Sequence, residues 1–369
     1  MRIAVTGPDG FLAWHVRCNL QARTGQDAIL ISRNELENPD LLIKSLEHCS
    51  AVIHLAALNR DAPDEVILTN NVSTTQALAD AIVEIGHPVP VIFANSIHAD
   101  GSSAFGVSKR ESSKILSELE AKTGSIFVDV VLPNIFGEHG RANYNSFVAT
   151  FCSQVFRGDQ VTIDSDREIS LLHAQEAADL LIDAAINPQS GRIDPKGKPH
   201  LISDVLATIQ VIAEAYRTGQ YPDLSDKFTR DLFNTYRSHG FPEMFPIHPD
   251  AMTDPRGRLI EAVRAYGGQT QVFFSTTKPG ITRGNHFHLR KVERFLVIQG
   301  RARISLRRLF TDEVISFDVT GDKPAIIDMP TMWSHNITNT GDTELVTLFY
   351  QNEVFNPLDP DTYPTKVEL

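Results

Sequence analysis

The segment RIAVTGPDGFLA, residues 2–13, decides the fold of the first half of the chain. Its apolar start runs directly into a glycine, which is typical of a buried parallel strand, and apolar residues at helical spacing follow from Phe11. Gly7 permits a tight turn, and Gly10 lets backbone N–H groups approach a pyrophosphate at the start of the helix. Ala13 stands where a dinucleotide-binding fingerprint has its third glycine. Taken alone, the motif is also compatible with a plain tight turn.

Strand and helix patterns alternate from this unit to residue 132. The predicted strands are 2–6, 28–31, 51–57, 89–94 and 126–132, and the predicted helices after the first are 41–46, 74–85 and 106–121. This βαβ alternation predicts an α/β Rossmann-like, doubly wound parallel sheet with helices on both faces.

The residues after the second strand bear on the choice of cofactor. An NAD-selective site places an acidic side chain here, whereas this chain has Ser32, Arg33 and Asn34. A hydroxyl and a guanidinium suit a ribose 2′-phosphate, so the sequence favours NADPH over NAD. The alternative is an arginine in a surface loop.

The pattern changes near residue 245. A proline-punctuated stretch, 239–249, leads into short β-rich runs separated by turn residues, namely 271–275, 294–298, 303–306, 325–327 and 345–350. We therefore expect a first domain over 1–245 and an all-β jelly-roll or barrel domain over 246–369.

The second half contains a set of residues typical of a metal site. His286 and His288 lie two apart and share one face of a strand, while Glu293 and His335 would come from neighbouring strands. Three imidazoles and one carboxylate suit a divalent metal with room for water or substrate. Zn²⁺ is the first choice, although the residues do not separate it from Fe, Mn or Ni.

Composition and charge exclude several classes of protein. With 34 Lys+Arg, 46 Asp+Glu and a net charge of −12, the chain is not suited to bind nucleic acid. No apolar run approaches the ~20 residues of a membrane helix. The three widely spaced cysteines form no disulfide framework, so we expect a reduced, cytoplasmic protein without membrane insertion. Residues 281–310, however, contain eight arginines or lysines and a single acid, Glu293. This basic cluster is either a binding site for a diphosphate or a solvent-exposed face.

Across roughly residues 1–240, the chain resembles the extended short-chain dehydrogenase/reductases that act on nucleotide sugars. The resemblance lies in the motifs Thr6-Gly7-x-x-Gly10-Phe11, His54-Leu55-Ala56-Ala57, Asn71-Val72, Ser96, Phe105-Gly106-x-Ser108-Lys109, Pro133-Asn134-x-Phe136-Gly137 and Leu171-Leu172-His173. It implies a cofactor site made by Gly7, Gly10, Phe11, Leu12, Ser32, Arg33, Leu55, Ala56 and Lys109. It also implies a catalytic Tyr-x-x-x-Lys pair, in which the tyrosine transfers a proton and the lysine binds the nicotinamide ribose.

Lys109 occupies the lysine position, but Phe105 occupies that of the tyrosine. A phenyl ring neither donates nor accepts the proton that accompanies hydride transfer. Three interpretations remain open: an engineered substitution, a natural variant that uses Ser96 or a water, and a domain that binds cofactor without turnover. The predicted catalytic positions are Ser96, Phe105 and Lys109.

The second half resembles a cupin, except that Met332 replaces a usual glycine of its second motif, which is expected to narrow the cup. The fused order resembles the CapF/WbjC enzymes of capsule and O-antigen biosynthesis over essentially the whole chain, through motifs such as Asn143-Tyr144-Asn145-Ser146, His335-Asn336-Ile337 and Pro360-Asp361-Thr362-Tyr363.

This second resemblance implies a homodimer that binds a UDP-2-acetamido-2,6-dideoxy-hexos-4-ulose. The cupin would epimerise C3 and the reductase would reduce C4 with NADPH, giving a UDP-N-acetyl-6-deoxy-talosamine on the route to N-acetyl-L-fucosamine. The predicted substrate-binding residues are Asn134, Arg283 and Lys291. The epimerase also needs a general base, for which Lys291, His248 and Tyr350 are candidates that the sequence does not rank. A sugar 3,4-ketoisomerase and a non-catalytic nucleotide-sugar scaffold or sensor are the alternatives.

Overall fold

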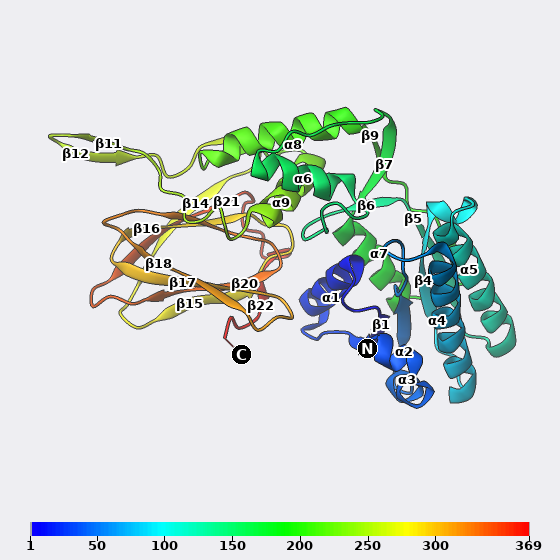
Figure 1. Cartoon of the computed structure of the whole chain (residues 1–369). Coiled ribbons are helices and arrows are strands. Elements are labelled where there is room, and N and C mark those ends of the chain that lie inside the picture. Colours follow the sequence, from blue (N-terminus) through cyan, green and yellow to red (C-terminus); the bar gives the residue numbers. More distant parts are fainter. Residues whose placement is uncertain (1, 369) are drawn as a thin grey trace. The chain divides into compact units, whose positions relative to one another are not determined.

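The computed structural model describes residues 2–368, which form two compact units (Figure 1). The first unit contains the chain up to Phe136, together with Asn143–Ser146 and Arg167–Leu201. The second contains Gly137–Ala142, Phe147–Asp166 and the chain from Ile202 onward. Across the described residues, no helix is both long and apolar enough to span a membrane.

A six-stranded parallel sheet forms the centre of the first unit. Its strands, in spatial order, are β2 (Ile29–Ile31), β1 (Ile3–Thr6), β3 (Ala51–His54), β4 (Val91–Ser96), β5 (Phe127–Leu132) and β8 (Gly191–Ile193). Every neighbouring pair is parallel. The chain leaves β1 toward β2 on one side and returns to β3 on the other, so the predicted doubly wound fold is confirmed, with its switch point between β1 and β3.

Helices cover both faces of this sheet, because successive strand residues alternate between two cores. Val5 and Ile53 belong to the core beneath α1 (Phe11–Thr24) and α7 (Ala174–Ile186). Ala4 and Val52 belong to the opposite core, which is covered by α2 (Arg33–Glu37), α3 (Pro39–Leu46), α4 (Asp64–Ile85) and α5 (Ala104–Thr123). A short 3-10 helix, η1 (Ile97–Asp100), precedes α5, and β6 (Asn134–Phe136), β7 (Glu168–His173) and β9 (Lys198–Leu201) form a separate small sheet.

Two antiparallel sheets, referred to below as the sandwich, enclose the apolar core of the second unit. One sheet has the order β14 (Gln271–Thr277), β21 (Leu345–Gln351), β16 (Glu293–Gln299) and β19 (Ile326–Met329). The other has the order β18 (Val314–Thr320), β17 (Arg301–Arg308), β20 (Trp333–Asn339), β15 (Thr282–Phe287) and β22 (Tyr363–Pro364). The predicted all-β architecture is confirmed. Strands β15 and β20 agree with the strands that the sequence predicts to carry His286 and His335, although β15 ends one residue before His288. Sequence patterns did not predict β18, because polar residues interrupt its apolar run.

Three helices belong to the same unit as the sandwich, namely α6 (Phe147–Arg157), α8 (Ile202–Arg217) and α9 (Lys227–Gly240). Two strand pairs accompany them, β10 (Tyr221–Asp223) with β13 (Ala265–Gly267), and β11 (Ala251–Asp254) with β12 (Gly257–Ile260). Residue 245 therefore marks the change from α/β to β-rich sequence, while the compact unit extends to segments on its N-terminal side. A domain boundary at 245 stays a prediction.

A buried ion pair ties α8 to the sandwich. Arg294 on β16 donates two hydrogen bonds to Asp328 on β19, at 2.7 and 2.9 Å, and both side chains are fully buried. The Tyr216 hydroxyl at the end of α8 donates to the same carboxylate at 2.7 Å, and Arg294 donates further to the carbonyls of Gly219 and Ala262. Burial by itself raises the pKa of Asp328, but the ion pair with Arg294 holds it below its usual value. The charges are stable here only because each one has its partners.

We predict that Asp328→Asn strongly destabilises the second unit, because the Arg294 charge then stays buried without a counter-charge. The expected loss is about 3–5 kcal/mol in the free energy of unfolding. Urea unfolding can follow Trp333 fluorescence with Trp14 replaced by phenylalanine, since these are the two tryptophans of the chain and they lie in different units. The matched control is Asp318→Asn, which breaks the solvent-exposed pair with Arg303 and should change little. Equal effects of the two variants would contradict the prediction.

Candidate functional site

The predicted cofactor residues of the first unit meet at one edge of the parallel sheet. Gly7 follows β1, Ser32 follows β2, Leu55 follows β3 and Ser96 ends β4. Carboxyl ends of parallel strands share one edge, and in open α/β sheets ligands bind at that edge beside the switch point. The structure thus brings together residues that lie far apart in the chain.

The glycine turn has the geometry of an anion site. Gly7 adopts φ +65°, and a Cβ there would come within 2.9 Å of the Ala56 Cα, so the close approach of the two loops requires glycine. Gly10 is the N-cap of the 14-residue helix α1 and provides no side-chain hydrogen bond. The N–H groups of Phe11 and Leu12, in the first turn, therefore have no partner within the helix. Such a helix start attracts a phosphate.

Ser32 and Arg33 occupy the start of α2, beside the glycine turn. The Gly7 N–H donates to the Ile31 carbonyl at 3.0 Å, which fixes the turn against the end of β2. Ser32 forms a capping box with Glu35, in which its N–H and hydroxyl both donate to the Glu35 carboxylate. Arg33 is exposed. The guanidinium is thus available to a ligand, whereas the Ser32 hydroxyl already has a partner.

A buried polar network supports this edge from below. The Thr6 hydroxyl accepts the N–H groups of Leu55 and Ala56, each at 3.0 Å, and bonds to the His54 ring at 2.8 Å. The far nitrogen of His54 contacts Thr75 at 3.0 Å. Burial, with Lys109 as a second cause, lowers the pKa of His54 to about 3, so the ring is neutral at pH 7. The network holds β1, β3 and α4 in register beneath the cofactor edge.

Lys109 is buried beside Phe105. Its ammonium donates to the Ala94 carbonyl at 2.7 Å and lies 4.6 Å from the Phe93 ring centroid and 5.6 Å from that of Phe105. Burial lowers the pKa of Lys109 to about 8, although nearby Asp129 opposes the shift. A cation between two aromatic faces is stabilised without a carboxylate in contact. The structure places Phe105 next to the lysine, as the sequence motif predicts.

Gly106 determines how α5 approaches the strand that carries Ser96. A Cβ at Gly106 would come within 2.1 Å of the His98 carbonyl in η1. The Ser96 hydroxyl accepts the His98 N–H at 3.2 Å and is half-buried at the end of β4. Asn134 starts β6 and is also half-buried. The roles of Ser96 and Asn134 stay predictions.

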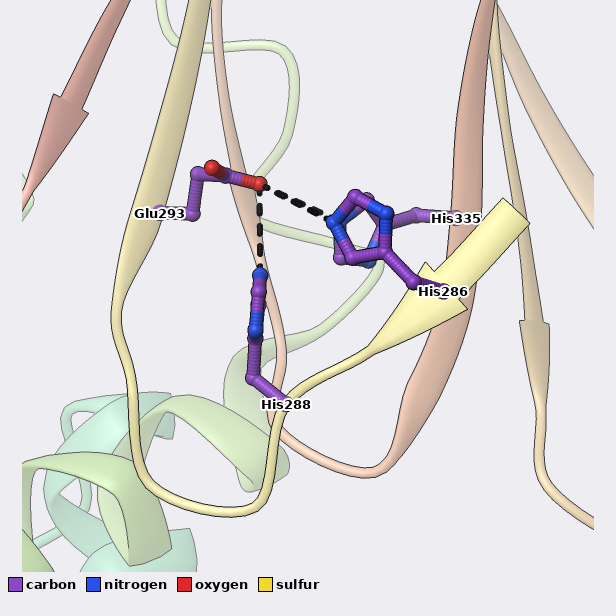
Figure 2. Close-up of side chains that lie close together, drawn as sticks. All are labelled: His286, His288, Glu293 and His335. Atoms are coloured by element: carbon purple, nitrogen blue, oxygen red, sulfur yellow. Dashed lines mark hydrogen bonds and ion pairs between the residues drawn. The ribbon is translucent and has the colours of Figure 1, made fainter. Parts of the chain in front are cut away.

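In the second unit, His286, His288, Glu293 and His335 converge inside the sandwich (Figure 2). One ligand atom from each lies within 4.8 Å of the others. A Glu293 carboxylate oxygen lies 3.1 Å from His335 Nε2, 3.4 Å from His288 Nε2 and 3.9 Å from His286 Nε2. Glu293 comes from one sheet, whereas His286 and His335 are paired neighbours in the other. Figure 2 shows the carboxylate facing the three rings.

Backbone carbonyls set the ring tautomers of this cluster. A carbonyl only accepts hydrogen bonds, so His288 Nδ1 carries the hydrogen that it donates to the Asp361 carbonyl. By the same argument His335 Nδ1 donates to the Trp333 carbonyl at 3.2 Å. Both Nε2 lone pairs are then free to bind a metal, and the donor set fits a divalent transition metal.

Burial and charge at the cluster also suit a cation. Although burial by itself raises the pKa of the Glu293 carboxyl, the imidazole rings that surround it hold this pKa well below its usual value. His288 and His335 are almost fully buried, but 23% of the His286 side chain is exposed. The cluster is therefore closed on three sides and accessible at His286, which leaves room for a ligand.

Two neighbours of the cluster were not identified from the sequence. Gln351 on β21 donates to the second Glu293 oxygen at 2.6 Å. Asp361 contacts the loop after His288, as described below. The only sequence signal for Gln351 was its place at the end of a β-rich run. Asp361 lay within a motif carried by resemblance alone.

The other predicted residues of this unit contact residues outside the cluster. Lys291 is buried, and its ammonium donates to the Pro360 carbonyl at 2.6 Å, so its substrate role stays a prediction without structural support. Exposed His248 contacts the Pro324 carbonyl, and Tyr350 stacks on Tyr221. Tyr350 precedes Gln351 on β21 and therefore points to the opposite face of the sheet. None of the three base candidates is placed as a base at the cluster.

Of the predicted basic residues, Arg283 is exposed and donates to Thr277 and to the Thr276 carbonyl on β14. Arg303 pairs with Asp318, which agrees with the solvated-face reading of this part of the basic cluster. Met332 has φ +62°, a conformation that favours glycine, and its N–H donates to the His288 carbonyl at 2.7 Å. The position at which the sequence departs from the predicted cupin motif is therefore hydrogen-bonded to the backbone of His288, a predicted metal ligand.

We predict that His335→Ala and Glu293→Gln each lose most of the bound divalent metal, because each removes one of four donors. Metal content after dialysis, measured by mass spectrometry, checks this. His248→Ala is the matched control, since it removes an exposed histidine of the same unit. Retention of full metal content by His335→Ala would contradict the assignment of the cluster.

Two family models match the chain. Residues 3–195, just over half of it, match the NAD dependent epimerase/dehydratase family. Residues 252–363 match the polysaccharide biosynthesis C-terminal domain.

Among the relatives found, two match along the whole chain and one matches part of it. A UDP-2-acetamido-2,6-beta-L-arabino-hexul-4-ose reductase from Pseudomonas aeruginosa is 30% identical over 372 residues, which cover 100% of this chain and 99% of the relative. The crystal structure of the capsular polysaccharide assembling protein CapF from Staphylococcus aureus is 29% identical, with a TM-score of 0.62 and 100% coverage of both chains. A UDP-N-acetylglucosamine 4-epimerase from Bacillus cereus matches 58% of this chain and 82% of its own, at 25% identity and a TM-score of 0.52.

These matches confirm the predicted resemblance and, through the family, a nicotinamide cofactor. The chain belongs to the NAD dependent epimerase/dehydratase family, as a member of the CapF type in which a polysaccharide biosynthesis C-terminal domain follows the epimerase domain.

Proposed function

We propose that this protein is a bifunctional UDP-sugar C3-epimerase and NADPH-dependent C4-reductase of capsule or O-antigen biosynthesis. The observation that carries the proposal is the three-histidine, one-carboxylate cluster in the same chain as a nicotinamide fold. The substrate would be a UDP-2-acetamido-2,6-dideoxy-hexos-4-ulose, in keeping with the full-length relative named as a reductase of such a compound. The product would be UDP-N-acetyl-6-deoxy-talosamine, on the route to N-acetyl-L-fucosamine.

The epimerase step needs the acidity of a C–H bond beside a ketone. A proton on C3 becomes removable when the negative charge that develops on the C4 oxygen is stabilised. A divalent metal, with Zn²⁺ our first choice, would supply Lewis-acid stabilisation there. Glu293 and the three histidines would hold the metal, and the exposed side of His286 would admit the sugar. The Phe295 ring lies 5.8 Å from the His335 ring and 4.7 Å from the Phe349 ring, measured between ring centroids, so aromatic side chains adjoin the His335 side of the cluster.

The reductase step would use the sheet edge of the first unit. The first turn of α1 would bind the pyrophosphate of NADPH, and Arg33 its 2′-phosphate. Lys109 would bind the nicotinamide ribose, and Ser96 would donate a hydrogen bond to the C4 oxygen. The C4 oxygen must also gain a proton, and the phenyl ring of Phe105 does not supply it.

We further propose a cytoplasmic homodimer. The second unit exposes apolar side chains on its β-structure, including Met252, Leu259 and Phe274. Met252 and Leu259 lie on the β11–β12 hairpin, whose strands reach away from the sandwich in Figure 1. An isolated two-stranded hairpin is marginally stable in water, so a second copy that covers it is the occupant favoured here.

Two alternative functions would give different outcomes with the same substrate. A sugar 3,4-ketoisomerase would leave the carbonyl at C3 instead of C4. A scaffold or sensor would bind NADPH and UDP-sugar tightly without turnover at either site. Product NMR after incubation of the 4-keto sugar nucleotide, with and without NADPH, separates all three.

We predict that the enzyme exchanges the C3 hydrogen of the 4-keto sugar nucleotide for deuterium in D₂O without NADPH. Proton NMR of the recovered sugar nucleotide would show loss of the C3 signal. His335→Ala should abolish the exchange because it removes a donor of the metal cluster. Absence of C3 deuterium with fully metal-loaded protein would rule out the epimerase.

We predict that Phe105→Tyr accelerates C4 reduction by about 10²–10⁴-fold, because the phenol supplies the proton that hydride transfer requires. The decrease in NADPH absorbance with the 4-keto substrate measures this rate. The double variant Phe105→Tyr/Lys109→Met is the control and should lose the gain. If the natural protein already reduces the ketone as fast as the tyrosine variant, another group delivers the proton.

A further inference from the structure

The C-terminal segment, residues 360–368, contacts the elements that carry the three histidines. Strand β22 pairs with His286 and Phe287 at the end of β15. The Ser334 hydroxyl, next to His335, donates to the Thr365 carbonyl. The segment thus bridges β15 and β20, two strands of one sheet that present metal donors.

Asp361 is the centre of these contacts. Its side chain is fully buried, and its carboxylate accepts three successive backbone N–H groups, from Leu289 at 2.9 Å, Arg290 at 3.0 Å and Lys291 at 2.7 Å. These residues form the loop between the donors His288 and Glu293. A buried carboxylate is costly unless its oxygens accept hydrogen bonds, so the loop and the carboxylate stabilise each other.

The backbone of the same residue orients a metal ligand directly. The Asp361 carbonyl accepts the Nδ1 hydrogen of His288, which turns Nε2 toward Glu293. Asp361 has φ +42°. In this backbone conformation its carboxylate accepts the N–H groups of residues 289–291, and its carbonyl accepts the Nδ1 hydrogen of His288. Lys291 completes the attachment, because its ammonium donates to the Pro360 carbonyl at 2.6 Å.

We propose that Asp361 is a positioning residue for the metal centre. Its carboxylate holds the 289–291 loop and its carbonyl holds the His288 ring, so that the donors are arranged before the metal arrives. The inference rests on the metal binding of the proposed function and adds to it a residue that touches no metal. A donor set arranged in advance binds its metal more tightly, since less ordering is needed on binding.

The test compares Asp361→Asn and Asp361→Ala with Asp359→Asn. Asp359 is an exposed carboxylate two positions away that pairs with Arg290 but accepts none of the three loop N–H groups. Affinity for Zn²⁺ is measured by competition with a chromogenic chelator, and the Co²⁺-loaded proteins give visible spectra that report ligand geometry. Urea unfolding of the metal-free proteins measures stability separately.

For Asp361→Asn we expect metal affinity to fall by about 10–100-fold, with a changed Co²⁺ spectrum. Asp361→Ala should fall at least as far, and Asp359→Asn should match the natural protein in both measurements. Lys291→Met provides a milder variant for the case in which Asp361→Ala does not fold, because it loosens the same segment from Pro360. Lys291→Met should also lower metal affinity, by a smaller factor than Asp361→Asn.

Unchanged metal affinity and an unchanged Co²⁺ spectrum in Asp361→Asn would overturn the proposal. An equal loss in Asp359→Asn would also overturn it, because the effect would then be one of charge near the loop. If the natural protein itself binds neither Zn²⁺ nor Co²⁺, the proposed epimerase function fails together with this inference. Tight binding by both the natural protein and Asp361→Asn refutes the positioning role alone.

Discussion

The buried ion pair between Arg294 and Asp328 is the constraint on which the second unit depends. Two opposite charges with no solvent exposure are tolerable only if every donor and acceptor finds a partner. Those partners are Tyr216 from α8 and the carbonyls of Gly219 and Ala262, so the outer face of the sheet requires the preceding helix. A sandwich without α8 would expose this pair to water or leave it unsatisfied. The helix and the sheet are therefore parts of one unit.

The opposite face of the same strand carries the proposed metal cluster. Because side chains alternate along a strand, Arg294 points toward α8 while Glu293, one residue earlier, points into the sandwich. One ion pair thus fixes the strand that presents the carboxylate ligand. Gln351 and Asp361 then restrict the carboxylate and the His288 ring. Three kinds of contact therefore position the site. The ion pair fixes strand β16, Gln351 on the neighbouring strand β21 binds Glu293, and the C-terminal segment binds His288 through Asp361.

Much of the fold and the grouping of the three histidines with Glu293 were predictable from the sequence. The glycine turn at Gly7, the βαβ alternation and the spacing of His286 and His288 are local patterns, which backbone geometry converts directly into structure. The bounds of β15 were not predictable, because the strand has a bulge at Asn285 and lacks an alternating apolar pattern. Lys291 was predicted to bind substrate, yet its ammonium contacts a carbonyl 69 residues along the chain.

What the sequence determined by itself was the type of each half and which four side chains form the histidine–carboxylate cluster, because periodicity and residue spacing are short-range properties. Only the tertiary structure decided which contacts those residues make. It placed Lys109 between two phenyl rings, grouped α8 with the sandwich, and brought Asp361 to the loop after His288. Each of these contacts joins residues that are distant in the chain. Buried charges and N–H groups need hydrogen-bond partners, and the folded backbone determines which residues are close enough to provide them.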